Sequence, residues 1–310
     1  MFDTTLRWSL LNVGKGFCMG AADVVPGVSG GTMAVVLGIY QRLVNAIRAF
    51  DGDFLRLLLS ARLGSAAHHA DLWFLSTLGT GVAGGLWFFT RVIPLPELIR
   101  TQPIPIYSLF FGLIAASIVV LLQSLNRFRT KEAAALVLGL AVGTGIVNLI
   151  PTATPETGWF IFLSGALAIC AMILPGISGS FILLILQKYT YIFEAIGKFD
   201  LSILLPFGLG AVTGLMLFSR FLSWLLRHFY RPTISAITGL LIGSLWIIWP
   251  FQHRLEAMSA GKPRVIQSTP YLPDLLQGDV LVAAGCVLAG LILVLALHRL
   301  AGRHESPQAR

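Results

Sequence analysis

The chain has 310 residues, of which 56% are hydrophobic and only 12% are charged, and its formal net charge is +8. Soluble domains carry roughly 25% charged residues, and the mean hydropathy of this chain is +0.82. These values exclude a soluble enzyme, a disordered protein and a nucleic-acid-binding domain. The positive charge instead fits the Lys and Arg residues that membrane proteins gather in cytoplasmic loops. We therefore expect an all-α polytopic membrane protein with no nucleic-acid partner.

The apolar blocks predict membrane-spanning helices along the whole chain. A helix needs about 20 largely apolar residues to cross a bilayer. Two apolar regions, 6–48 and 159–197, are interrupted in the middle. Six segments are long enough to cross without interruption: 72–90, 105–125, 133–150, 202–222, 233–250 and 280–298. Each interrupted region thus precedes three predicted spans.

The two interruptions have closely similar sequences. They read Pro26-Gly27-Val28-Ser29-Gly30-Gly31-Thr32 and Pro175-Gly176-Ile177-Ser178-Gly179-Ser180. Proline lacks an N–H donor and disfavours helix in the residue before it. We therefore expect the helix to break at both places, at Pro26 and Gly27 and at Pro175 and Gly176.

The similarity between the two parts of the chain continues beyond the breaks, which lie 149 residues apart. At the same offset, Tyr40 matches Tyr189. Later positions match in order at offsets of 129 and then 127 residues: Gly79, Gly81, Gly85, Arg91 and Gly112 with Gly208, Gly210, Gly214, Arg220 and Gly239. We interpret the chain as an internal duplication of 1–150 and 151–310, forming one membrane domain.

The distribution of basic residues predicts the orientation of the two halves. If each broken region is a re-entrant hairpin, each half crosses the membrane three times, and the second half is inverted relative to the first. With both termini and the 41–70 loop in the cytoplasm, fifteen of the 22 Lys and Arg residues lie inside. This excess agrees with the positive-inside rule. Segments 151–158 and 251–279 then face outward.

Breaks at matching positions of inverted halves point to a binding site near the membrane midplane. Ser29 and Ser178 are good N-cap residues, and Gly30, Gly31 and Gly179 allow close approach of the backbone. Free N–H groups and the helix dipole favour an anion there, with Thr32 and Ser180 as hydroxyl donors. We expect a cradle for a phosphate or carboxylate. The alternative is that each motif only kinks a helix for packing.

Three charged residues could serve such a site. Asp23 lies three residues before the first break and could exchange protons, whereas its counterpart in the second half is Met172. Arg91 and Arg220 share one repeat position and could bind the anion, or they could extend to the lipid headgroups. The sequence contains no metal-spaced cluster, nucleotide loop or serine with a nearby catalytic base. We therefore expect no metal, no cofactor and no enzymatic activity.

The residues around both breaks resemble those of a known bacterial family. The first run is Lys15-Gly16-x-x-Met19-Gly20-x-x-Asp23-x-Val25-Pro26-Gly27-Val28-Ser29-Gly30-Gly31-Thr32, followed by Gly38-Ile39-Tyr40. It is similar to the polyprenyl-phosphate (undecaprenyl-phosphate) transporter family, once catalogued as a membrane domain of unknown function. The second run, from Leu174 to Ser180 with Tyr189, is similar too. It departs at Gln187-Lys188-Tyr189, where the first half has Gly-x-Tyr.

The resemblance implies a flippase in the bacterial cytoplasmic membrane, with both termini in the cytoplasm. It would return undecaprenyl phosphate, the lipid carrier for cell-wall polymers, across the membrane by alternating access. Proton coupling through Asp23 would offset the cost of moving the anionic headgroup against an inside-negative potential.

Two other functions stay open at this point. Undecaprenyl-pyrophosphate phosphatases also have inverted repeats with broken helices, but their paired glutamates and P-G-x-S-R arginine have no equivalents here. The corresponding residues are Gly20-Ala21-Ala22-Asp23 and the Ser-Gly pairs of the two breaks. A small-anion channel or exchanger would fit the paired breaks equally well.

Overall fold

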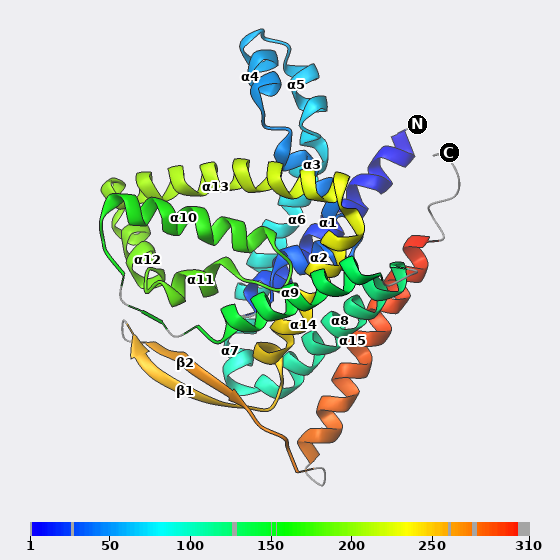
Figure 1. Cartoon of the computed structure of the whole chain (residues 1–310), viewed down its shortest axis with the longest axis vertical. Helices are drawn as coiled ribbons and strands as arrows, with labels where there is room; N and C mark the ends of the chain where they lie inside the picture. Colours follow the sequence, from blue (N-terminus) through cyan, green and yellow to red (C-terminus); the bar gives the residue numbers. More distant parts are fainter. Residues whose placement is uncertain are drawn as a thin grey trace.

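Helices form most of the chain, and the first half of the sequence contributes nine of those described (Figure 1). The computed structural model describes residues 2–25, 28–125, 129–149, 151–152, 154–259, 262–274 and 278–302. The helices of the first half are α1 (Phe2–Val24), α2 (Gly30–Val36), α3 (Tyr40–Arg48), α4 (Gly52–Leu59), α5 (Leu63–His69), α6 (Leu72–Arg91), α7 (Leu95–Thr101), α8 (Pro103–Ser124) and α9 (Thr130–Val147).

The second half repeats the broken region and the three long helices. Its elements are α10 (Gly158–Ile173), α11 (Gly179–Ile185), α12 (Tyr189–Lys198), α13 (Leu201–His228), α14 (Tyr230–Ile248), β1 (Gln252–Ser259), β2 (Lys262–Pro270) and α15 (Gly278–Gly302). Among the described residues, six helices are long and apolar enough to cross a membrane: α6, α8, α9, α13, α14 and α15. All six predicted uninterrupted spans are therefore confirmed as helices.

The long helices pack in pairs whose contacts depend on glycine. Helix α1 packs along α6, and α10 packs along α13. A Cβ atom on Gly81 would collide with the Val13 carbonyl oxygen, and one on Gly210 would collide with that of Phe162. These glycines let the helix backbones touch, as expected of small residues between membrane helices.

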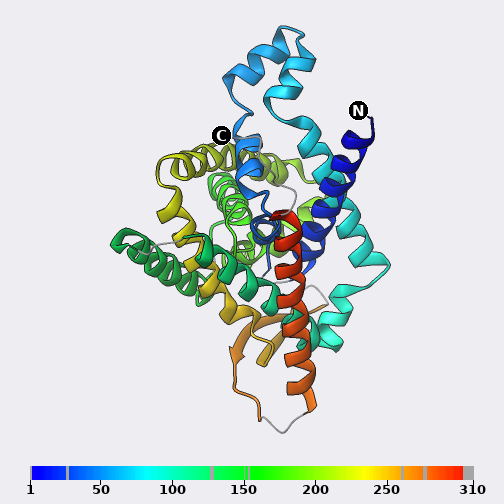
Figure 2. The same ribbon diagram turned by 90° about the vertical axis from the view of Figure 1, so that its right-hand side faces the viewer.

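The last helix of each half packs against the other half. Helix α15 lies along α8, and α9 lies along α14, while α8 and α14 also contact each other (Figures 1 and 2). Gly112 of α8 faces the backbone of Val287, and its repeat counterpart Gly239 of α14 faces Leu136. The same helix contact therefore occurs twice: the middle long helix of each half packs against the last helix of the other half.

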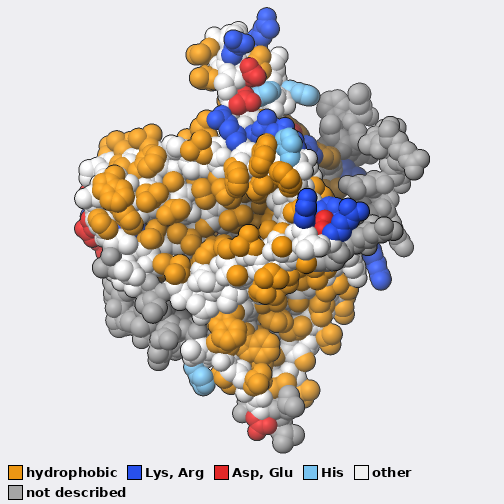
Figure 3. All heavy atoms as spheres, viewed as in Figure 1, with side chains coloured by type: hydrophobic (Ala, Val, Ile, Leu, Met, Phe, Trp, Pro, Cys, Tyr) orange, Lys and Arg blue, Asp and Glu red, His pale blue; other side chains and the backbone are white. Residues whose placement is uncertain are grey.

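Apolar side chains cover much of the outer surface, and charged ones gather elsewhere. Figure 3 shows a broad hydrophobic surface on the body of the molecule, with charged residues on the protruding α4–α5 hairpin. On α13, Leu201, Leu205 and Leu209 are each about 60% exposed. An exposed apolar surface of this kind suits contact with lipid chains.

The expected helical architecture with six candidate membrane helices is confirmed, and one segment adds a short sheet that was not predicted. Within 251–279, strands β1 and β2 form a two-stranded antiparallel sheet, which pairs Gln252 with Pro270 and Ser259 with Lys262. The sheet satisfies backbone N–H and C=O groups that a long loop would otherwise leave to water. The segment is too polar to signal a membrane helix, so hydropathy alone gave no indication of strands.

Candidate functional site

Ser29 begins the short helix that follows the first break. Its side chain is buried, and its Oγ accepts a hydrogen bond of 3.0 Å from the Gly31 N–H. The backbone of Ser29 is extended, which is the usual conformation of an N-cap residue. The predicted capping role of Ser29 is confirmed. Pro26 and Gly27, the predicted break residues, lie outside the described residues.

Asp23 lies against the start of the same helix. Its Oδ1 accepts a hydrogen bond of 2.6 Å from the Gly30 N–H. A Cβ on Gly30 would come within 2.7 Å of Asp23 Oδ2, so glycine is needed for this approach. The carboxylate therefore occupies an N–H group that sequence reasoning assigned to the transported anion. A carboxylate is favourable there because the first N–H groups of a helix have no partner within the helix.

The second break differs from the first in its hydrogen bonds. Gly176 has φ of 89°, a left-handed conformation that suits glycine. Ser178 precedes α11 but makes no capping hydrogen bond with its side chain. Its Oγ instead lies 2.7 Å from Ser180 Oγ. The capping role predicted for Ser178 is therefore wrong in this conformation, because the Ser180 hydroxyl competes for the same oxygen.

The two breaks, which are far apart in sequence, touch in the interior. The Gly176 N–H donates a hydrogen bond of 2.9 Å to Oγ1 of the fully buried Thr32. Ser29 Oγ donates one of 3.4 Å to the Met172 carbonyl oxygen. A Cβ on Gly31 would come within 2.9 Å of the Ile173 carbonyl oxygen. Close contact between the breaks therefore depends on the small residues of both motifs.

The two halves of the candidate site differ in exposure. Ser29, Gly30, Gly31 and Thr32 are all buried, and each side-chain hydroxyl among them has a protein partner. In the second half Gly179 is also buried, and a Cβ there would come within 2.5 Å of the Ala168 carbonyl oxygen. The Ser178 side chain is half-buried and Ser180 is exposed. In this conformation the accessible hydroxyls belong to the second break.

Arg91 and Arg220 are not among the residues that make these contacts. Arg91 is the last residue of α6, Arg220 lies within α13, and both are exposed. Within the described residues, neither arginine makes a hydrogen bond or ion pair with a residue of either break. The structure brings the two breaks together without the two arginines.

Comparison with known proteins supports the motif assignment. Residues 19–265, which include both breaks, match the family described as "Undecaprenyl phosphate translocase-like". The chain belongs to this family. A "Polyprenyl-phosphate transporter" of Vibrio cholerae is 43% identical over 225 residues, covering 71% of each chain. A protein of the same name from Staphylococcus aureus is 32% identical over 72% of this chain and 79% of its own. No solved structure matches.

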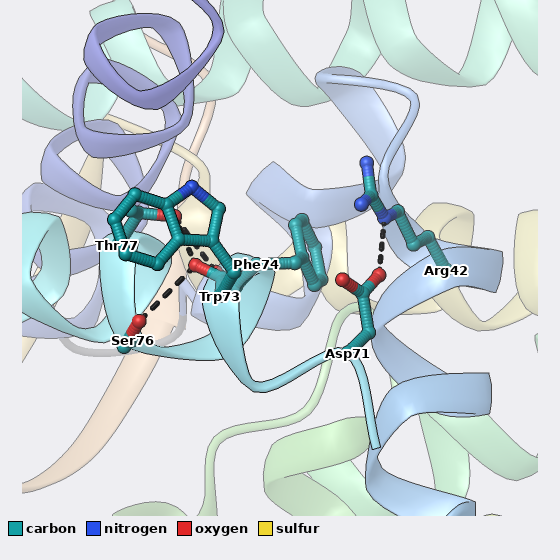
Figure 4. Close-up of polar contacts among 6 residues, drawn as sticks. All are labelled: Arg42, Asp71, Trp73, Phe74, Ser76 and Thr77. Carbon is teal, nitrogen blue, oxygen red and sulfur yellow. Dashed lines mark hydrogen bonds and ion pairs between the residues drawn. The ribbon is translucent and has the colours of Figure 1, made fainter. Parts of the chain in front are cut away.

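Sequence reasoning missed a cation that lies beside a cavity of this translocase-like protein. Arg42 Nε lies 2.7 Å from Asp71 Oδ2 (Figure 4). The guanidinium lies 4.8 Å from the Trp8 ring centroid and 4.4 Å from that of Phe74. The adjacent cavity has a volume of about 660 Å³ and is lined by Arg42, Ala67, His68, Asp71, Leu72, Trp73 and Ser76. A single arginine near the start of α3 carries no motif that would have revealed it.

Asp51 joins the start of α4 to the end of α5 in the neighbouring hairpin. Its Oδ1 accepts a 3.0 Å hydrogen bond from the Phe54 N–H and contacts His69 Nε2 at 3.0 Å. The backbone hydrogen bond from Phe54 and the contact with His69 lower the pKa of Asp51. Asp51 therefore caps α4 as a carboxylate at neutral pH.

The departure from the family pattern at Gln187-Lys188-Tyr189 introduces a second missed cation. Gln187 has φ of 53° and its counterpart Gly38 has φ of 69°, so both halves make the same left-handed turn. Lys188 is only 2% exposed, and its Nζ donates a hydrogen bond of 2.8 Å to the Thr154 carbonyl oxygen. The departure therefore keeps the backbone of the turn and adds a buried ammonium group.

Proposed function

We propose that this protein transports polyprenyl phosphate across the bacterial cytoplasmic membrane and is not an enzyme. Family membership supports the substrate class, and both relatives are named as transporters. The observation that carries the proposal is the buried hydrogen bond between Gly176 N–H and Thr32 Oγ1. It joins the non-helical backbone of the second break to the first turn of α2 in the interior, and non-helical backbone at membrane depth is tolerated where it is buried or lines a polar path.

We further propose that the two halves, 1–150 and 151–310, are inverted repeats with re-entrant hairpins. The exchanged pairing of α15 with α8 and of α9 with α14 supports the duplication. The Thr152 N–H donates a hydrogen bond of 3.0 Å to the Ile185 carbonyl oxygen, so the segment before α10 lies beside the end of α11. Arg42 of α3 similarly lies over Trp8 of α1. Both contacts support broken regions that enter and leave on the same side.

The proposed topology makes a prediction for surface labelling. Single cysteines in the 41–70 loop, such as Ser60→Cys, are expected to react only with reagent that reaches the cytoplasm. Cysteines at Gln252 or Tyr271 are expected to react with a membrane-impermeant reagent outside the cell. The reason is that three crossings per half place these segments on opposite sides. Labelling of both segments from the same side would contradict the inverted repeat.

The phosphate site that we propose includes residues of both breaks: Ser29, Gly30, Gly31 and Thr32, with Ser178, Gly179 and Ser180. The exposed hydroxyls of Ser178 and Ser180 support first contact at the second break. The hydroxyls of the first break are occupied by protein partners. Alternating access would therefore require Thr32 and Ser29 to exchange their present hydrogen-bond partners for others. Arg91 and Arg220 would attract the headgroup as it approaches, one from each side.

Transport itself is tested with the purified chain in liposomes containing polyprenyl phosphate. A phosphatase added outside hydrolyses only the phosphate groups exposed in the outer leaflet. Liposomes with the protein are expected to lose their inner-leaflet share too, whereas protein-free liposomes keep it. Phosphate release from liposomes that contain polyprenyl pyrophosphate, with no phosphatase added, would indicate an enzyme, and rapid flux of inorganic anions would indicate a channel. Either result without headgroup movement would contradict the proposal.

A further inference from the structure

Lys188 is unusual because its charge is buried without a carboxylate. Its Nζ donates to the Thr154 carbonyl oxygen and lies 5.9 Å from the Phe160 ring centroid and 5.7 Å from that of Tyr191. Within the described residues, no acidic oxygen lies within 4.0 Å of this ammonium group. Among the described residues, one carbonyl and two ring faces are its partners, so two of its three N–H donors have no conventional acceptor there.

Stability of the fold does not explain such a residue. Removing an ammonium group from water costs free energy, which is recovered only with good geometry and a full set of hydrogen bonds. The segment before α10 is already attached to the end of α11 without Lys188. The Thr152 N–H bonds to the Ile185 carbonyl oxygen and Thr154 Oγ1 donates to that of Leu186. Ionisable residues buried in membrane proteins mark substrate paths more often than structural contacts.

The first half places a cation at nearly the same position. Lys188 and Tyr191 correspond at the repeat offset to Ile39 and Arg42. These positions are three residues apart, so each half carries one cation within one helical turn of the same place. Both cations also lie over an aromatic ring near the start of the first helix of their half, Arg42 over Trp8 and Lys188 over Phe160.

The two cations differ in access to solvent. The Arg42 side chain is 44% exposed and borders the 660 Å³ cavity, whereas Lys188 is almost completely covered. In the proposed topology, Arg42 lies on the cytoplasmic side and Lys188 on the outer side. This conformation therefore has an accessible cation on the inner side and a covered cation on the outer side.

We propose that Lys188 binds the phosphate headgroup of the lipid on the outer side of the membrane. The inference rests on the proposed transport function and topology. When the segment around Thr154 moves away, the ammonium group exchanges a carbonyl acceptor for phosphate oxygens, with which it forms charge-assisted hydrogen bonds. The helices that supply its two rings also carry exposed apolar side chains, Trp159 on α10 and Phe193 on α12, which offer contact for the polyprenyl chain.

The test uses the purified full chain in liposomes of neutral lipid with limiting amounts of polyprenyl phosphate. Lys188→Gln keeps a donor for the Thr154 carbonyl oxygen but removes the charge. We expect it to slow headgroup transport about ten-fold, with an increased lipid concentration for half-maximal rate. Lys188→Arg keeps the charge and is expected to stay within about two-fold of the wild type. Thermal stability of both variants is measured in parallel.

Lys198→Gln is the matched control. Lys198 lies at the end of α12 on the same side of the membrane, and its side chain is 77% exposed. The Lys198→Gln variant should transport polyprenyl phosphate at the wild-type rate. If Lys188→Gln also transports normally, or if Lys188→Arg fails as badly as Lys188→Gln, the inference is overturned. A wild-type protein that moves no headgroup would instead contradict the proposed function.

Discussion

Gly81→Ala and Gly210→Ala are expected to destabilise the protein strongly, whereas Gly79→Ala and Gly208→Ala are not. A Cβ on Gly81 or Gly210 would meet a carbonyl oxygen of the facing helix, and a backbone atom cannot rotate away. The helix pairs would have to separate, at a cost on the order of 1–3 kcal/mol in the free energy of unfolding. Nothing lies within 4 Å of a Cβ on Gly79 or Gly208, where alanine gains about 0.5–1 kcal/mol of helix propensity.

The same comparison can be made in each half of the chain, because the four glycines occupy two equivalent positions of the repeat. Gly79 and Gly81 correspond to Gly208 and Gly210. Loss of folded protein on heating in detergent, followed by size-exclusion chromatography, measures the four variants under identical conditions. Equal melting temperatures for all four would contradict the packing of α1 on α6 and of α10 on α13. A difference in one half only would mean that the halves do not pack alike.

Repetition made the fold largely predictable from sequence. Six long apolar segments and the two breaks follow from hydropathy and from residue types that recur in order. The contact between the breaks was also expected, because matching interruptions in a duplicated membrane protein point to a shared interior site. The β1–β2 sheet could not be anticipated in this way, since it lies in a long polar segment between α14 and α15, whereas the corresponding helices α8 and α9 are joined by a short one.

The details of the site were less predictable, because they depend on which of several acceptors a polar group finds. Ser29 and Ser178 have the same sequence context, yet only Ser29 caps its helix. The difference comes from the residue two positions later, which is Gly31 in one break and Ser180 in the other. Lys188 was noticed only as a departure from a pattern. Its burial is a tertiary property that local sequence does not encode.

Asp23→Asn is expected to make transport insensitive to pH while leaving the fold intact. Asparagine keeps an oxygen that can accept the Gly30 N–H, but it cannot bind and release a proton. A phosphate monoester carries about −1.5 to −2 charges near neutral pH. Moving each charge inward against an inside-negative potential costs about 2.3 kcal/mol for each 100 mV. A proton carried by Asp23 would offset part of that cost, and it would also reduce the repulsion between the carboxylate and a phosphate near Gly30.

If Asp23 carries a proton inward with the headgroup, transport depends on the pH on both sides of the membrane. Acid outside supplies the proton, so wild-type uptake should rise with an inward proton gradient and weaken at alkaline pH. One pH unit provides about 1.4 kcal/mol for each proton, which corresponds to as much as about ten-fold in transport. The Asn variant should show neither effect, and Asp53→Asn, at an exposed position of α4, should behave like the wild type. If wild type and Asp23→Asn respond equally to the gradient, another group carries the proton. If neither responds, transport is not proton-coupled, and Asp23 serves only to hold Gly30 at the start of α2.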